Sequence, residues 1–150
     1  GLSAMNGVGA TLETDPRQCL DYLDSSNKKF YKSTYTFGNG VTTADTYDAR
    51  RGFSAFYCPP SYTAFCTILP PNTANCSNGN RDSWGVYSAS SQHSGGVNVV
   101  LFDGSIRFIP DTINCVSTGI TTPKQVTSGP SEFGVWGAMG SISGSESVAP

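Results

Sequence analysis

The segment that decides the fold reads VNVVLFDGSIRFI and spans residues 97–109. Two runs rich in β-branched and aromatic residues flank Asp103-Gly104. An Asp-Gly pair between such runs predicts a β-hairpin with a two-residue turn, because both turn positions favour a positive φ. In that register Val99 would face Phe108, and the opposite face would be mixed in polarity. This pattern predicts a hairpin that is covered on both sides.

Outward from the hairpin, the chain favours short strands and loops with little helix. Thr14-Asp15-Pro16 combines a capping residue, an acid and a proline, which predicts a helix over residues 15–25. Residues 28–57 are rich in Tyr, Phe and Thr and favour short strands. Two Pro-Pro pairs and a polar run predict that residues 58–83 form an ordered surface loop and no central strand. A short helical turn is expected near residues 132–139.

The expected fold class is therefore α+β and mainly β. It comprises an antiparallel sheet that contains the Asp-Gly hairpin, one short N-terminal helix and long ordered loops. A chain of 150 residues is the usual size of one domain, so residues 1–150 are expected to form a single domain. Residues 1–13 are small and Gly-rich and are expected to be a flexible end or an edge strand, and residues 141–150 a flexible tail.

Charge and hydropathy exclude two classes of partner. Charged residues make up 13% of the chain, the net charge is −2, and no basic stripe is present. Nucleic acid is therefore excluded as a partner, because its binding requires a row of cations. The longest apolar run, Val99–Phe102, is far too short to cross a bilayer. We expect no membrane contact from this segment.

Five cysteines lie at positions 19, 58, 66, 76 and 115. None forms a C-x-x-C motif and there is one histidine, so the usual zinc and haem spacings are absent. Disulfides suit an exported chain. Cys58 and Cys66 flank a stiff Pro-Pro loop that could bring them together, and Cys19 and Cys76 could form a longer bridge. The odd count leaves a thiol or an intermolecular bond, and unpaired buried thiols are the alternative.

The single histidine, His93, does not predict a catalytic dyad with Asp103. Six strand residues separate Gly96 from Asp103, which corresponds to about 20 Å at the rise of a β-strand. His93 is expected to fix the turn at residues 94–96, and Asp103-Gly104 to make the hairpin turn. No spacing selects a Ser nucleophile with its base or a pair of carboxylates across a cleft. We expect no enzymatic activity.

One polar segment is a candidate calcium site. Asn78, Asn80 and Asp82 place oxygen ligands at alternate positions, as in the first half of a calcium-binding loop. The glycine and the distant glutamate of the complete loop are missing, so a polar turn is the alternative. No other cofactor is expected.

The spacing His93-x9-Asp103-Gly104 resembles the motif of a large prepilin-like family of unknown function. Residues 60–77, 84–93 and 133–140 are similar to the carboxy-terminal half of that family as well. The resemblance implies the globular head of a type IV pilin-like or type II secretion pseudopilin-like protein, anchored by an N-terminal helix. That helix and the prepilin cleavage motif are missing from this sequence. Calcium sites are familiar in pseudopilin heads.

The function that the resemblance implies is structural and non-enzymatic. The chain would lie outside the cytoplasm, at the periplasmic face or the cell surface, and its partners would be other pilin-like or secretion-system subunits. The alternative is a surface module that binds a glycan or a solute, since a solute-binding label is also attached to this family. Four aromatic residues could then stack on sugars if they were exposed: Tyr57, Tyr62, Trp84 and Trp136.

Overall fold

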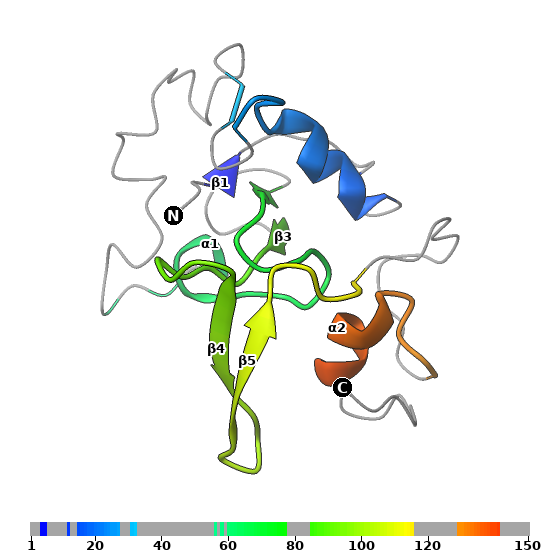
Figure 1. Cartoon of the computed structure of the whole chain (residues 1–150). Coiled ribbons are helices and arrows are strands. Elements are labelled where there is room, and N and C mark those ends of the chain that lie inside the picture. Colours follow the sequence, from blue (N-terminus) through cyan, green and yellow to red (C-terminus); the bar gives the residue numbers. More distant parts are fainter. Residues whose placement is uncertain are drawn as a thin grey trace.

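The structure is a computed structural model of the whole chain. It describes residues 4–5, 12, 15–27, 31–32, 56, 58, 60–77, 85–115 and 129–141. The elements along the chain are β1 (Ala4–Met5), the 3-10 helix η2 (Pro16–Tyr22), α1 (Pro60–Thr63), β2 (Asn75–Ser77), β3 (Gly85–Tyr87), β4 (Gly96–Val100), β5 (Ile106–Pro110) and α2 (Gly134–Met139) (Figure 1). The predicted fold class, α+β and mainly β, is confirmed.

Strands β1, β2 and β3 form one small sheet with β2 at its centre. β1 runs parallel to β2 and β3 runs antiparallel to it. The prediction that residues 58–83 contain no central strand is therefore wrong. Both Pro-Pro pairs lie before β2 in the sequence, so they remove no hydrogen bond from it. Of the strands predicted over residues 28–57, nearly all lie outside the described residues.

The polar sequence of β2 is accommodated by partners far away in the chain. The Tyr31 hydroxyl lies 2.8 Å from both the backbone N and the backbone O of Asn75. The Asn75 side-chain oxygen accepts the backbone N–H of Ser88 at 2.8 Å. Because these bonds replace water, Asn75 is fully buried at little cost. The neighbouring Cys76 is bonded to Cys19.

The predicted N-terminal helix is present at the expected place, as a 3-10 helix. Asp15 caps η2 by accepting the backbone N–H of Arg17 at 3.1 Å, and Pro16 occupies the first turn. The Arg17 guanidinium also donates to Asp15, and these contacts hold the pKa of the Asp15 carboxyl below its usual range. At the end of the helix, the cap residue Leu23 donates its N–H to Leu20 O, the i→i+3 bond of short helices.

A disulfide between Cys19 and Cys76 links η2 to the central strand, with a Cα–Cα distance of 5.8 Å. Both sulfurs are buried in the first hydrophobic cluster. Its buried members are Leu12, Cys19, Leu23, Leu69, Ala74, Cys76 and Val86. The single bond therefore closes a loop of 57 residues and lies inside the core that it stabilises.

Strands β4 and β5 form the predicted hairpin, but their register differs from the prediction by one residue. Val99 lies opposite Arg107, and Asn98 opposite Phe108. The turn has three residues, because Leu101 N–H donates to Ser105 O at 2.9 Å. Within the turn, Gly104 alone has a positive φ, of 80°. This is the geometry of a three-residue loop with glycine in the left-handed position.

The second hydrophobic cluster joins the hairpin to the C-terminal helix α2, which agrees with the helical turn expected near residues 132–139. Its buried members are Ala89, Val97, Ile109, Cys115 and Trp136. The Trp136 indole N–H donates to Leu69 O at 3.1 Å, and Leu69 belongs to the first cluster. α2 therefore contacts the first cluster at Leu69, a residue of the loop that precedes β2.

We expect the Cys19→Ala/Cys76→Ala double variant to lose about 4 kcal/mol of unfolding free energy, because the unfolded chain regains the entropy of a long closed loop. Urea denaturation followed by tryptophan fluorescence measures this change. Cys58→Ser is the control, since Cys58 is an exposed thiol, and its unfolding free energy should stay within about 0.5 kcal/mol of the wild type. Equal losses in both variants would contradict this account of the disulfide.

Candidate functional site

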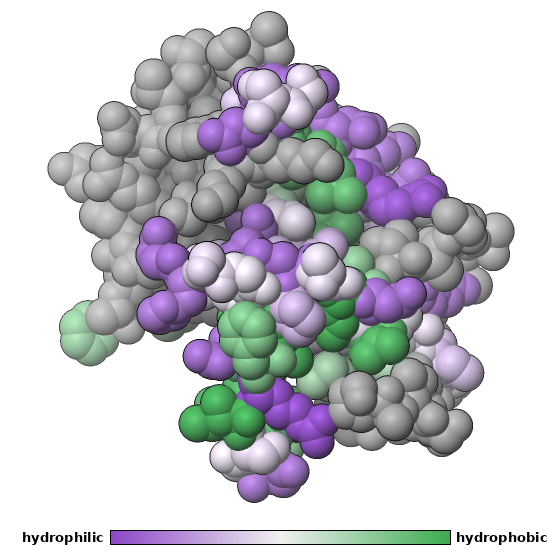
Figure 2. All heavy atoms as spheres, viewed as in Figure 1, coloured by the Kyte–Doolittle hydropathy of each residue, from purple (hydrophilic) through white to green (hydrophobic). Residues whose placement is uncertain are grey.

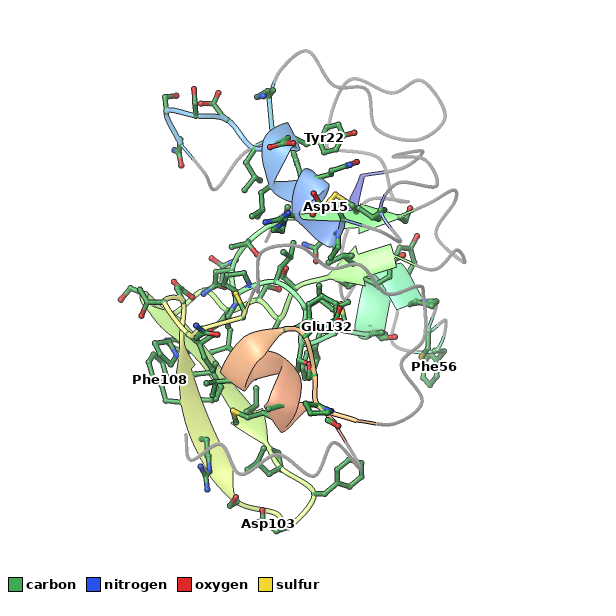
Figure 3. All side chains as sticks on the ribbon, turned by 90° about the vertical axis from the view of Figure 1, so that its right-hand side faces the viewer. Asp15, Tyr22, Phe56, Asp103, Phe108 and Glu132 are labelled. Carbon is green, nitrogen blue, oxygen red and sulfur yellow. A yellow bond between two sulfur atoms is a disulfide. The ribbon has the colours of Figure 1, made fainter. Side chains whose placement is uncertain are left out.

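The candidate site is the β4–β5 hairpin, because its two ends carry the motif residues His93, Asp103 and Gly104. His93 precedes β4 and Asp103 lies in the turn that follows it, so the five-residue strand separates them by about 16 Å. Figure 3 shows Asp103 at the tip of the hairpin, far from the body of the molecule. The structure therefore does not bring His93 and Asp103 together within one chain.

At the base of the hairpin, His93 takes part through its backbone N–H. His93 N–H donates to the Ser91 hydroxyl at 3.1 Å, and the residue itself is exposed. Gly95 has a φ of 88°, a left-handed conformation that favours glycine. Its carbonyl accepts the Asp111 N–H at 2.9 Å, which continues the pairing pattern of the two strands.

Gly96 begins β4 and is required for close packing. A Cβ atom at this position would lie 2.2 Å from Ile109 O and 2.6 Å from the Phe108 ring. The Phe108 ring therefore lies across the backbone of the opposite strand, where only glycine leaves room. The two adjacent glycines, which lie between the motif residues His93 and Asp103, have different roles, since a Cβ at Gly95 would meet nothing within 4 Å.

At the tip, Asp103 stabilises the turn as a hydrogen-bond acceptor. Its carboxylate accepts the Ser105 N–H at 2.8 Å, and Gly104 N–H closes the turn on Leu101 O at 2.9 Å. Hydrogen bonds from the Ser105 side chain and backbone hold the pKa of the Asp103 carboxyl below its usual range. The tip of the hairpin therefore carries a negative charge at neutral pH.

Asn72 connects the hairpin to the rest of the molecule, and the sequence analysis missed it. Its side chain donates to Asp111 at 2.8 Å and to Gly96 O at 3.4 Å, and it accepts the Ser91 N–H at 2.7 Å. Asn72 also has a φ of 58°. The signal in the sequence was its place directly after Pro70-Pro71, where asparagine favours a turn.

The cysteines outside the disulfide correct one prediction. Cys58 and Cys66 are thiols, so the Cys58–Cys66 bridge is absent. The Cys66 sulfur instead lies 3.2 Å from the backbone N and 3.4 Å from the backbone O of Tyr87, and it faces β3. Cys58 is exposed and precedes α1 in the sequence, whereas Cys66 follows that helix. Burial raises the pKa of the Cys115 thiol.

The structure also bears on the predicted calcium site and on the four aromatic residues of the predicted sugar site. Asn78, Asn80 and Asp82, the calcium candidates, lie outside the described residues, as do Tyr57 and Trp84. Tyr62 and Trp136 are buried, so neither offers a ring to a sugar. In the described part of the chain, no three His, Cys, Asp or Glu residues are grouped as metal ligands. None of the described helices has the length and hydropathy needed to cross a membrane.

Comparison with known families places the chain in a family of unknown function. The family model SBP_bac_10, described as a protein of unknown function (DUF1559), matches residues 7–115. The matched region includes both halves of the disulfide and the whole β4–β5 hairpin. No curated protein and no solved structure matches the chain.

We expect Gly96→Ala to destabilise the fold by about 2–3 kcal/mol, because the new methyl group would overlap the Ile109 carbonyl and the Phe108 ring. Gly95→Ala is the matched control, which should cost only about 1 kcal/mol for the left-handed backbone. Thermal and urea denaturation measure both. Equal costs for the two substitutions would show that close packing is not the reason for Gly96.

We expect Asn72→Ala to lower the unfolding free energy by about 3 kcal/mol, since it removes three hydrogen bonds and leaves alanine in a left-handed conformation. Asn98→Ala is the control, because Asn98 is exposed on β4, and its change should stay within about 0.5 kcal/mol. Hydrogen exchange should also accelerate at the Ser91 amide in Asn72→Ala, because the Asn72 side chain accepts that N–H. Unchanged exchange at Ser91 would contradict the role assigned to Asn72.

Proposed function

The chain belongs to the DUF1559 family, and from this premise we propose that it is a non-enzymatic structural subunit of the cell envelope. Specifically, it would be the globular head of a type IV pilin-like or type II secretion pseudopilin-like protein. Its partners would be other subunits of the same assembly. It would act outside the cytoplasm.

The observation that carries this proposal is the buried disulfide between Cys19 and Cys76. Disulfides of this kind persist in oxidising compartments and are rare in the cytosol. The bond lies between η2 and the central strand, so the core of the described fold includes it. An extracytoplasmic location is compatible with such a core.

The family motif supports a structural role in a second way. Two of its residues, Asp103 and Gly104, form the turn of the hairpin, as an acceptor and as a left-handed position. Gly95 and Gly96, which lie between His93 and Asp103, supply a left-handed turn and a close approach. Residues that shape a hairpin suit a protein whose function is to present a surface.

The alternative, a glycan- or solute-binding module, is favoured by one feature. Phe65 is half-exposed and stacks on Trp136, with ring centroids 6.3 Å apart and an angle of 9° between the planes. A ring fixed in this way could contact the apolar face of a sugar. Since Tyr62 and Trp136 are buried, however, the described residues offer few exposed aromatic rings beside polar groups, and we place this function second.

The proposal is tested in the source organism by alkylating thiols in intact cells before lysis, followed by peptide mapping. We expect Cys19 and Cys76 to be recovered as a linked peptide, and protease added to intact or outer-membrane-permeabilised cells to digest the protein. Cys58 serves as the internal control, because its exposed thiol should be alkylated. Recovery of Cys19 and Cys76 as alkylated thiols, in a protein protected from protease, would refute an extracytoplasmic role.

A further inference from the structure

One face of the β4–β5 hairpin is covered and the other is not. The pairs Val97–Ile109 and Val99–Arg107 share the face that packs toward α2. The remaining strand positions lie on the opposite side, which we call the hairpin face. It consists of Asn98, Val100, Ile106, Phe108 and Pro110, and Phe102 adjoins it at the tip. Figure 3 shows Phe108 on the side of the two strands turned away from α2.

The hairpin face exposes large apolar side chains. Val100 is 70% exposed, Ile106 71%, Phe108 54% and Phe102, in the turn, 106%. Figure 2 shows hydrophobic atoms at the surface in the region where β4 and β5 lie in Figure 1. Together these side chains expose on the order of 500 Å², near the upper limit of the largest apolar patch on a typical monomer, and patches of this size mark interaction surfaces.

The chemistry of the hairpin face excludes sugars and lipids as its best ligands. Asn98 is the only polar side chain on it, whereas a sugar or a nucleotide requires several convergent polar groups. Insertion of Phe102 into a lipid bilayer would bring the neighbouring Asp103 carboxylate with it. That carboxylate is ionised and accepts a hydrogen bond from Ser105, so its transfer into lipid would be costly. The face therefore fits an apolar protein surface.

The apolar surface that fits it best is the same face of a second copy. No charged side chain lies on the hairpin face, so two copies can pack face to face about a two-fold axis without opposing like charges. In the antiparallel arrangement the Asp103 tips lie at opposite ends, and each tip approaches the base of the partner hairpin, where His93 is exposed. A parallel arrangement would place the two Asp103 carboxylates side by side.

We propose that two copies of this chain associate through their hairpin faces in this antiparallel arrangement. The contact would bury roughly 1,000 Å² in total, which is at the lower limit of specific interfaces and corresponds to a weak complex. A face-to-face contact about a two-fold axis uses the hairpin face of both copies, so it closes at two copies and the expected complex is a dimer. This inference does not rest on the proposed function.

Sedimentation equilibrium of the whole chain tests the proposal, between about 10 µM and about 1 mM, the range in which an interface of this size associates. We expect the average mass to rise toward that of a dimer. The Phe102→Ser/Ile106→Ser variant should remain monomeric throughout. Phe56→Ser is the matched control, because Phe56 is 99% exposed and lies outside the hairpin face, and it should associate as the wild type does.

A cross-linking experiment tests the geometry. In a Cys58→Ser background, Asn98→Cys places a thiol near the centre of the hairpin face, close to the two-fold axis, and mild oxidation should yield a covalent dimer. Ser90→Cys, an exposed position off the face, should cross-link several-fold less. Near-ultraviolet circular dichroism verifies folding, and Phe102→Ser alone replaces the double variant if that variant unfolds.

The proposal is overturned if the wild type stays monomeric at the highest concentration, if the hairpin variant still associates, or if both cysteine variants cross-link equally. These results are independent of the proposed function. A monomer that is exported with the Cys19–Cys76 bond would refute only this inference. A dimer whose Cys19 and Cys76 are thiols in cells would refute only the extracytoplasmic role.

Discussion

The bond between Cys19 and Cys76 is the constraint on which the first half of the structure depends. β2 has only three residues, and two of them are polar, so it cannot hold a sheet together by apolar burial alone. The disulfide attaches it to η2, and the Tyr31 hydroxyl and Ser88 N–H bind Asn75 beside it. A short polar strand can lie at the centre of the sheet because the hydrogen bonds satisfy the polar groups of Asn75 and the disulfide fixes Cys76.

The hairpin depends on a different kind of constraint, one made of hydrogen bonds and close packing. Asn72 binds both the start of β4 and the residue after β5, and it also accepts an N–H from the preceding loop. Trp136 packs on the face of the hairpin that carries Val97 and Ile109, and its indole N–H donates to Leu69 O. With its base fixed at these points, the hairpin can extend away from the body and leave one face uncovered, which gives the molecule a defined surface for contact.

The sequence predicted those parts of the fold that depend on local chemistry. The hairpin at Asp103-Gly104, the helix that begins at Pro16 and the turn at residues 134–139 all follow from residues a few positions apart. The separation of His93 from Asp103 followed from the strand between them, and the Cys19–Cys76 pairing was one of the alternatives that the cysteine spacing left open.

The features that the sequence could not predict depend on contacts between residues far apart in the chain, or on a one-residue shift in the register of the hairpin strands. An Asp-Gly pair suits both a two-residue and a three-residue turn, and the choice between them moves Val100, Ile106 and Phe108 onto one exposed face. β2 reads as a loop because its stabilising partners, Cys19 and Tyr31, lie more than forty residues away. Asn72 gives no sign in the sequence of the three groups that it joins.

The bond from Trp136 to Leu69 spans 67 residues, and the disulfide spans 57, so two of the bonds that hold the described fold together join distant segments. Proteins with such contacts fold slowly, because a large loop must close before any packing compensates for its entropy. The second cluster cannot close until the chain has been made as far as residue 136. During synthesis the second cluster would therefore form last, after every buried residue of the first cluster, which ends at Val86, has been made.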